Sequence, residues 1–366
     1  MNPYVPNELP LTELDYKCLL PLVGRANREL ARYDGLLQGL VNPEVLLSPL
    51  TVEEATLSSR LEGTQATVDD IYEHEAGLAN PEKAQDIQEV VNYRTALRLG
   101  QEQLRQYPIT LPFVREIHKI LLNGVRGEKK RPGMFRMDQD WIGTSGCSIE
   151  EATFVPPEPN RLLDHLEAWK EYLNGMDIDV LIQTAVMHAQ FELLHPFMDG
   201  NGRIGRLLIP LYLFQKKALS QPMFYLSSYL ESHREGYYAA LNGISKNGDW
   251  NGWIAYFLTA VSSQAVGNIK SVNKIRALYE DMKNRIQKVT QSQFSIVVLD
   301  QIFRRPVFRT TDFIKETKIQ RATATTLLRQ LHDAQILREI KPGSGRKPAV
   351  MCFPALVNAA EGKDVM

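Results

Sequence analysis

The twelve residues from His195 to Arg206 have the sequence HPFMDGNGRIGR and combine residue types that phosphate chemistry uses. A neutral imidazole such as that of His195 can accept a proton near physiological pH. A carboxylate such as that of Asp199 can hold Mg²⁺. Gly200 and Gly202 let backbone N–H groups approach an anion, because no Cβ stands in the way. The stretch therefore predicts a site for a phosphate-bearing ligand.

The residues after these glycines predict a helix whose N-terminus faces the same ligand. Residues 204–209 are mostly apolar, and a helix that begins before them directs the partial positive charge of its N-terminus at the anion. Arg203 and Arg206 lie three residues apart on one helix face and can bind further phosphate oxygens. A capped helix with surface arginines would explain any few of these residues, but the complete set favours the phosphate site.

The complete stretch resembles the signature of the Fic (filamentation induced by cAMP) family, HPFx(D/E)GNGRxxR, and matches it at every fixed position. The resemblance implies transfer of AMP from ATP to a hydroxyl group of a target protein, with Mg²⁺ as cofactor. It implies that His195 is the catalytic base, that Asp199 is the metal ligand, and that the two arginines hold the β- and γ-phosphates. The ATP-binding residues that it implies here are Gly200, Asn201, Gly202, Arg203, Ile204, Gly205 and Arg206.

A second stretch, residues 51–63, predicts a short helix that ends on a carboxylate. Thr51 and Glu54 have the spacing of a capping box, and Gly63 lies where a helix C-cap is expected. Glu62 is unfavourably placed in the last turn, because the C-terminal end of a helix carries partial negative charge. The unfavourable position invites a cationic partner, and an exposed glutamate without a role is the alternative that the helix alone leaves open.

Ser58, Glu62 and Gly63 match the (S/T)xxxE(G/N) inhibitory motif of many Fic proteins. Because the motif precedes the core, the chain resembles the self-inhibited class with an N-terminal inhibitory helix. We therefore expect Glu62 to pair with Arg206 and to occupy the site that the ATP γ-phosphate needs. Some Fic proteins instead use this glutamate to position water and remove AMP, and others transfer different phosphate-containing groups, so the direction of the reaction stays open.

Composition indicates a soluble protein of ordinary type. The 366 residues are 44% hydrophobic and 23% charged with a net charge of −1, which argues against a nucleic-acid or membrane partner for the chain as a whole. No apolar run approaches the roughly 18 residues that span a bilayer, and the first residues show no signal-peptide pattern. The three cysteines, Cys18, Cys147 and Cys352, are widely spaced and indicate free thiols in a reducing compartment. We expect a cytoplasmic protein.

Apolar residues at steps of three and four predict a mainly α-helical fold. His118, inside one of these helices, is expected to be a core or surface residue rather than a ligand. Besides 51–62 and the helix after His195, the expected helices occupy residues 14–37, 69–106 with a break at Asn80–Pro81, 111–122, 160–175, 178–194, 232–241 and 250–269.

Residues 127–159 are rich in Gly, Pro, Ser and Thr and contain two strand-like pieces, 140–143 and 153–156. They predict a β-hairpin, with a solvent loop of no role as the alternative. Fic proteins carry a hairpin "flap" at this place, which binds an extended target peptide through main-chain hydrogen bonds. The resemblance places Phe154 and Val155 of the flap in the nucleotide pocket.

The tyrosine pair Tyr237–Tyr238 follows the motif at a distance that resembles the adenine-facing residues of the family. Two aromatic core residues are an equally simple interpretation, and the sequence leaves both open.

The C-terminal part differs in charge from the rest. Residues 292–352 hold 11 Lys and Arg against 5 Asp and Glu, a net +6 against −7 for the remainder. Helices at 294–303, 310–316 and 321–333, with strand-like pieces at 337–340 and 349–353 around a Pro-Gly-Ser-Gly turn, resemble a winged helix-turn-helix. As a DNA reader this module would place Arg321, Thr323 and Arg329 in the major groove. A module that only packs against protein is the alternative.

The sequence thus predicts a mainly α fold, with a Fic-type helical core, a β-hairpin flap and a small winged helix-turn-helix domain. We expect an N-terminal helical segment (1–110) with the inhibitory helix (51–63), a catalytic core (111–270), a helical connector (271–291) and the winged-helix module (292–366). The expected partners are ATP, a target protein with a Tyr, Ser or Thr hydroxyl, and DNA or protein at the winged helix, but no membrane. The target and the oligomeric state stay open, with a homodimer as one alternative.

A DNA-binding regulator that uses the core only to sense nucleotide is a further alternative. The intact His195 disfavours it, since binding alone requires no base.

Overall fold

The predicted fold class is confirmed: the protein is mainly helical, with a small three-stranded antiparallel sheet in its C-terminal part. The computed structural model describes residues 2–78, 80–144, 146–345 and 347–361. Among the helices of these residues, none combines the length and apolar character needed to cross a membrane.

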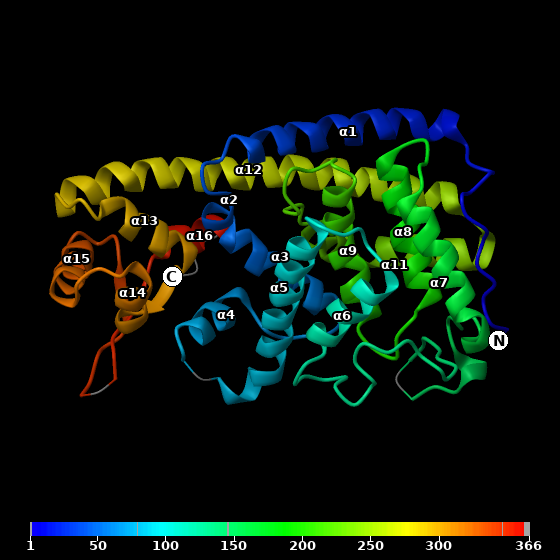
Figure 1. The fold of residues 1–366 in the computed structure, drawn as a ribbon, viewed down its shortest axis with the longest axis horizontal. Coiled ribbons are helices and arrows are strands. Elements are labelled where there is room, and N and C mark those ends of the chain that lie inside the picture. The colour runs from blue at the N-terminus through cyan, green and yellow to red at the C-terminus, as the bar shows by residue number, and fades with distance from the viewer. Residues whose placement is uncertain (1, 79, 145, 346, 362–366) are drawn as a thin grey trace.

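Two long helices form one face of the molecule. α1 (Tyr16–Gln38) and α12 (Trp250–Thr290) lie side by side along it, as Figure 1 shows. α1 begins where the Asp15 carboxylate accepts hydrogen bonds from the backbone N–H groups of Lys17 and Cys18, which satisfies two donors of the first turn. The leading helix expected from the sequence is confirmed. Its buried face consists of Leu19, Ala26, Glu29, Leu30, Tyr33 and Leu37.

α12 is one continuous helix of 41 residues, so the helix end expected near residue 269 is wrong. The chain becomes more charged beyond that point, but the charged residues occupy the exposed face of the same helix. The buried face continues at helical spacing through Val272, Ile275, Met282 and Ile286. α12 therefore joins the helical core to the C-terminal part without a hinge of irregular chain.

The centre of the molecule is formed by α8 (Val180–Leu194) and α9 (Asn201–Gln215), which flank the turn that begins at His195. Both helices are buried along most of their length, and the apolar residues of α8 are spread around the helix, as in a helix enclosed by others. α7 (Pro159–Asn174) and α12 pack on α8, while α5 (Ala84–Leu104) and α6 (Leu111–Leu121) pack on α9. This enclosure fixes both sides of the turn.

The N-terminal helices bring residues 51–63 to the same place. α3 (Ser48–Leu61) contacts α5, α9 and the short helix α10 (Ser227–Ser232). It is flanked by α2 (Pro43–Leu46) and α4 (Val68–Glu75), and the 3-10 turn Pro81–Lys83 precedes α5.

The helix predicted to start at Thr51 starts earlier, and its predicted capping box is wrong. Pro49 lies in the first turn, where proline is well tolerated. The Thr51 hydroxyl therefore donates to the Leu47 carbonyl within the helix. The Glu54 carboxylate instead accepts hydrogen bonds from the backbone N–H and hydroxyl of Ser227, which anchors α3 to α10.

The hairpin of the flap region is much shorter than the two expected strands, 140–143 and 153–156, would form. The pairing consists of one bridge, in which the Ile142 N–H donates to the Phe154 carbonyl at 2.8 Å. Between these positions the chain forms a short 3-10 turn, Ile149–Glu151, which interrupts the alternation that longer strands need.

The C-terminal part consists of α13 (Ser295–Arg304), β1 (Val307–Arg309), α14 (Thr310–Thr317), α15 (Arg321–Asp333), β2 (Arg338–Lys341), β3 (Val350–Cys352) and α16 (Pro354–Glu361). The sheet order is β1-β3-β2 and both pairs are antiparallel. The helices and two strands expected here are present. β1 was not expected, because three residues after a proline carry no periodic signal.

The C-terminal part packs directly on the N-terminal helices. α13 and α16 contact α3, and β1 contacts α4. The Ser48 hydroxyl at the start of α3 donates to the Arg304 carbonyl at 3.1 Å, and Arg309 donates to the Gly77 carbonyl.

A proline substitution tests the continuity of α12. We expect Lys270→Pro, at an exposed position in the middle of the helix, to destabilise the protein by about 3 kcal/mol or more, because proline removes one helical hydrogen bond and clashes with the preceding turn. Thermal unfolding measures the effect. Lys270→Ala is the matched control and should be close to neutral. Equal melting temperatures for both variants would indicate that the helix is interrupted at this position.

Candidate active site

His195 lies at the sharp turn that ends α8. Its φ of +46° is left-handed, a conformation that costs energy for a residue with a Cβ. Arg136, which is buried, holds this turn: its backbone N–H donates to the Pro196 carbonyl and its Nε to the His195 carbonyl, both at 2.9 Å. The sequence analysis missed this role, because a single arginine before the flap gives no sign of burial.

The His195 imidazole is partly buried, with 18% of the side chain exposed. Its Nε2 lies 3.7 Å from Oδ2 of Asp140, a second residue that the sequence analysis missed. Burial lowers the pKa of His195 below its ordinary value. The Arg136 guanidinium lowers it further, and together they outweigh Asp140, which raises it. The ring is therefore neutral at pH 7, as a proton acceptor must be.

The turn between the two helices is stabilised by Asn201. Its side-chain oxygen accepts from the Phe197 N–H at 2.9 Å, and its amide donates to the Phe197 carbonyl at 2.7 Å. Gly200 starts α9 with a φ of +80°, which glycine adopts without strain. In this structure the Asn201 amide closes the turn between α8 and α9.

His118 holds the same turn from α6. It is fully buried, its Nδ1 accepts from the Gly133 N–H at 2.8 Å, and its Nε2 lies 2.9 Å from the Asp199 carbonyl. Since Nδ1 accepts, Nε2 carries the proton and donates. Its ring also stacks on Phe197 at 3.6 Å between centroids. Burial lowers the pKa of His118 to about 4. The expectation of a structural histidine agrees with this geometry.

Gly202 and Gly205 allow two carboxylates to approach the backbone of α9. A Cβ on Gly202 would lie 2.2 Å from Oε1 of Glu62, and one on Gly205 would lie 2.2 Å from Oε1 of Glu192. Any side chain at either position would displace these groups. Ile204, between them, is fully buried and points into the core.

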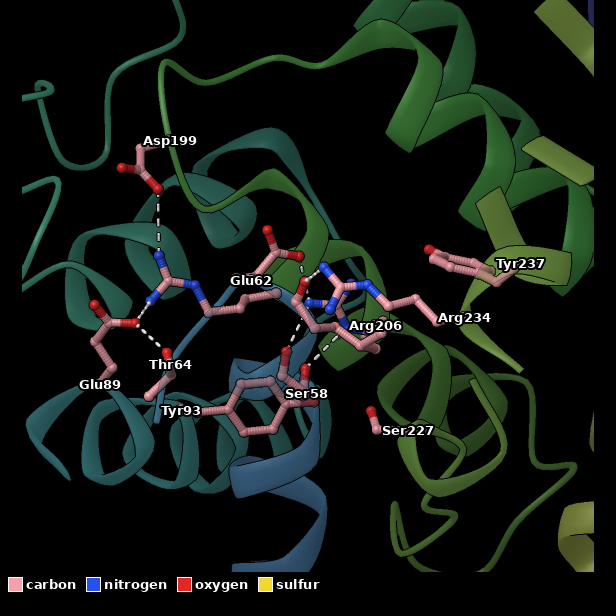
Figure 2. A network of polar contacts seen from close by, with 12 residues as sticks. Ser58, Glu62, Thr64, Glu89, Tyr93, Asp199, Arg206, Ser227, Arg234 and Tyr237 are labelled. Atoms are coloured by element: carbon pink, nitrogen blue, oxygen red, sulfur yellow. Dashed lines mark hydrogen bonds and ion pairs between the residues drawn. The ribbon is translucent and has the colours of Figure 1, made fainter. Parts of the chain in front are cut away.

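The predicted pairing of Glu62 with Arg206 is present. Arg206 Nη2 lies 2.6 Å from Oε1 of Glu62 and 2.9 Å from the Ser58 carbonyl, and Nε donates to the Ser58 hydroxyl at 3.0 Å. Figure 2 shows the carboxylate and guanidinium facing each other between α3 and α9. Gly63 adopts a φ of +93° just after Glu62, in agreement with the expected helix end.

The positive charge of Arg206 stabilises the ionised form of Glu62. Burial alone would raise the pKa of Glu62, but the adjacent Arg206 guanidinium and the neighbouring charges outweigh it, so the pKa of Glu62 lies below its ordinary value. Glu192, which the sequence analysis missed although it lies one helical turn before His195, has its pKa raised to about 8, chiefly by burial. One ionised and one protonated carboxyl therefore lie near Arg206 at pH 7.

Arg203 forms two ion pairs within the protein. It is fully buried, with Nη1 2.9 Å from Oε2 of Glu89 and Nη2 3.3 Å from Oδ1 of Asp199. Its charge is thus compensated within the protein by two carboxylates. Glu89, on α5, was also missed by the sequence analysis.

Asp199 can contribute to a Mg²⁺ site. Its side chain is 28% exposed and only Oδ1 is paired with Arg203. No group of three potential ligands is present among the residues the structure describes. Mg²⁺ is commonly held by one or two carboxylates together with substrate phosphates. The donor set therefore fits Mg²⁺ bound with a nucleotide rather than a site made by protein alone.

The four residues expected in the nucleotide pocket, Phe154, Val155, Tyr237 and Tyr238, differ in exposure. Val155 is buried, and its carbonyl accepts from the Tyr4 N–H at 2.8 Å. Tyr237 is buried, with its hydroxyl 2.9 Å from Nε2 of His188, which fits the core interpretation. Phe154 is 8% exposed and Tyr238 is 37% exposed. Of the four, Tyr238 is the most accessible to a ligand.

Three family models match parts of the chain. The chain matches the family model described as "Fic/DOC family" over residues 108–213, the model of the Fic/DOC family N-terminal region over residues 20–102, and the model of the C-terminal domain of SoFic-like protein adenylyltransferases over residues 278–347. The chain is thus similar to the Fic/DOC family over residues 20–102 and 108–213.

Curated relatives are similar over part of their length. The chain is 28% identical to a probable protein adenylyltransferase of Aquifex aeolicus over 56% of this chain and 60% of that protein. It is 28% identical to protein adenylyltransferase fic-1 of Caenorhabditis elegans over 50% of this chain and 34% of that protein. The match thus spans less than two thirds of either relative.

Solved structures show the same fold. A Fic family protein from Desulfovibrio desulfuricans superposes with a TM-score of 0.59 at 19% identity, over 95% of this chain and 98% of that one. Fic-1 from Caenorhabditis elegans superposes with a TM-score of 0.55 at 21% identity, over 70% of this chain and 74% of that one.

The buried position of His118 makes stability depend on pH. Its pKa is about 4 in the folded protein and about 6.5 when unfolded. Between these values the unfolded state binds the extra proton, so stability falls as the pH is lowered. From pH 7 to pH 5 this group alone should remove about 2 kcal/mol.

Chemical denaturation of wild type and His118→Gln at both pH values measures this term. The variant should be less stable at pH 7 but should lose less stability on acidification. An equal loss in both proteins would contradict a buried neutral His118.

Proposed function

We propose that the protein transfers AMP from ATP to a hydroxyl group of a target protein, and that Glu62 keeps it in an inhibited state. The observation that carries the proposal is the 2.6 Å ion pair between Glu62 and Arg206, beside a neutral His195 at the start of an intact HPFMDGNGRIGR stretch. The names of the curated relatives, which are protein adenylyltransferases, support the reaction class.

His195 accepts the proton of the target hydroxyl. The hydroxyl oxygen forms a bond to the α-phosphorus while the bond to pyrophosphate breaks, so AMP remains on the target. Asp140, 3.7 Å from Nε2, stabilises the imidazolium that results. The left-handed turn at His195 and its bonds to Arg136 hold the base in place for this step.

The N-terminus of α9 binds the phosphates. Backbone N–H groups at residues 200–202 stabilise the negative charge that develops around the α-phosphorus, and Arg206 binds the γ-phosphate once it is released from Glu62. Asp199 holds Mg²⁺, which when bound offsets phosphate charge. Arg203, enclosed by carboxylates, serves by orienting Asp199.

Inhibition follows from competition for Arg206. A guanidinium binds a carboxylate or a phosphate in the same planar arrangement and cannot serve both fully. With Glu62 in place, ATP binds with its phosphates displaced from the in-line position. A misplacement of ~1 Å can lower the rate on the order of 10²-fold.

The second candidate is the reverse reaction, removal of AMP from a modified protein. The specific observation that favours it is the 31% exposure of the Glu62 side chain, which leaves room for a water molecule that the carboxylate could position. In that case Glu62 is required for activity rather than inhibitory.

For the C-terminal part we propose a winged-helix module that acts mainly by packing. Its contacts with α3 and α4 support this over a free DNA reader. Duplex binding that weakens steeply with salt would favour the DNA reader instead.

Substitution of Glu62 tests whether this residue inhibits AMP transfer. Glu62→Gly should raise AMP incorporation strongly, because it frees Arg206, while ATP affinity changes much less. Incubation with α-labelled ATP and, separately, γ-labelled ATP measures the transfer, and only the α label should appear on protein. The double variant Glu62→Gly with His195→Ala should be inactive.

Lower activity of Glu62→Gly than wild type, together with loss of AMP removal from a modified target, would reject inhibition and support the reverse reaction.

The protonation of His195 sets the pH profile of the activated variant. Because the pKa of His195 is lowered from 6.5, transfer by Glu62→Gly should be constant from pH 7 to 8 and should fall only below about 6.5.

His195→Ala should lose ~10²–10⁴ in rate with nearly unchanged ATP binding. Equal losses of binding and rate would make His195 structural.

A further inference from the structure

Glu89 contacts both halves of the site, which are the His195–Arg206 stretch and the inhibitory segment that follows α3. Its side chain comes from α5, outside both the His195–Arg206 stretch and the α3 helix, and the residue is 1% exposed. In Figure 2 it lies between Thr64, which follows the inhibitory helix, and the side chain that reaches Asp199.

On one side, Glu89 fixes the motif helix. Its Oε2 lies 2.9 Å from Nη1 of Arg203, whose Nη2 lies 3.3 Å from Oδ1 of Asp199. Arg203 is fully buried, so its position depends on the two carboxylates that compensate its charge. A change at Glu89 is therefore transmitted through Arg203 to the carboxylate that faces the ligand.

On the other side, Glu89 holds the inhibitory segment by two contacts. The same Oε2 accepts from the Thr64 hydroxyl at 2.9 Å, in a buried position. Its Oε1 lies 3.7 Å from Nε of Arg126, whose Nη2 donates to the Glu62 carbonyl at 3.1 Å. The chain at residues 62–64 is thus tied to Glu89 directly and through Arg126.

We propose that Glu89 is a positioning residue shared by both halves of the site. Through Arg203 it sets Asp199, and through Thr64 and Arg126 it keeps residues 62–64 seated so that Glu62 reaches Arg206. This inference rests on the proposed function, since it assigns the regulation and the metal side of that site to one buried carboxylate.

The two roles can be separated by variants. Thr64→Val keeps the shape of the side chain and removes only the hydroxyl bond to Glu89, so it loosens the inhibitory segment and leaves the Glu89–Arg203–Asp199 chain intact. Glu89→Gln keeps the size and removes the charge that Arg203 requires, so it disturbs both sides. Glu89→Asp restores the charge with a shorter reach.

The first experiment measures AMP incorporation from α-labelled ATP for Thr64→Val in two backgrounds. In the wild-type background we expect a rise of up to about tenfold, because a buried hydrogen bond to a charged group is lost from the inhibited state. In the Glu62→Gly background we expect no change, since inhibition is already absent. Thr56→Val is the matched control: its buried hydroxyl donates only within α3, to the Val52 carbonyl, and activity should stay at the wild-type level.

The second experiment uses Glu62→Gly as the parent and measures Mg²⁺ binding by calorimetry with a non-hydrolysable ATP analogue. Glu89→Gln should weaken binding by about tenfold and raise the Mg²⁺ concentration for half-maximal transfer, because Asp199 is then pulled toward an uncompensated Arg203. Glu89→Asp should recover part of the loss. A purely structural role would lower stability without this shift or its recovery.

The outcomes distinguish this inference from the proposed function. If Glu62→Gly does not activate the enzyme, inhibition itself is rejected. If Glu62→Gly activates but Thr64→Val behaves as Thr56→Val does, Glu89 does not hold the inhibitory segment. Unchanged Mg²⁺ binding in folded Glu89→Gln overturns the link to Asp199. Should that variant fail to fold, Mg²⁺ binding by Glu89→Asp alone decides, and a value equal to the parent's overturns the link.

Discussion

The structure depends on two buried arginines in one helix. Arg203 and Arg206 belong to α9, which is enclosed on most sides, and a buried guanidinium without a partner is strongly destabilising. The partners are Glu89 on α5 and Glu62 at the end of α3. Because these carboxylates come from distant segments, compensation of the two charges fixes how the N-terminal helices dock on the motif helix. The same positive charges attract phosphate. Arg203 and Arg206 therefore contribute both to stability and to ligand binding.

The sequence predicted one of these partners and missed the other, for physical reasons. Glu62 could be found because Ser58, Glu62 and Gly63 resemble the inhibitory motif of Fic proteins, and because the carboxylate opposes its own helix dipole. Glu89 lies in the middle of a helix, where glutamate is common and favourable, so only the three-dimensional packing shows its burial. For the same reason the continuity of α12 was missed. A change in composition near residue 270 suggested a boundary, although apolar residues at helical spacing continued beyond it.

The helical core, the C-terminal helices α13, α14 and α15 and the start of the motif helix could be predicted, because periodicity and glycine positions are local. The helix α16 was not predicted. The hairpin was predicted at the right place, but its reduction to a bridge between Ile142 and Phe154 was not. The strand β1 was not predicted, because short strands gain their stability from partners far along the chain. The glycines were predicted to leave room for an anion at the backbone. That room is present, but a carboxylate of the protein itself occupies it. Gly202 leaves room for an anion at the backbone of α9, and in this structure the anion is the Glu62 carboxylate.

The turn at His195 illustrates how one residue can meet a structural and a chemical requirement together. α8 ends abruptly before Pro196, and its last carbonyl groups need donors. Arg136 supplies them, since its side chain donates to the carbonyls of His195, Leu194 and Pro157. The guanidinium that satisfies these carbonyls is also a positive charge beside the imidazole, and it adds to burial in lowering the pKa of His195. A neutral side chain could donate fewer bonds to this turn and would leave the base easier to protonate. The arginine that satisfies the helix end therefore also contributes, together with burial, to keeping His195 neutral.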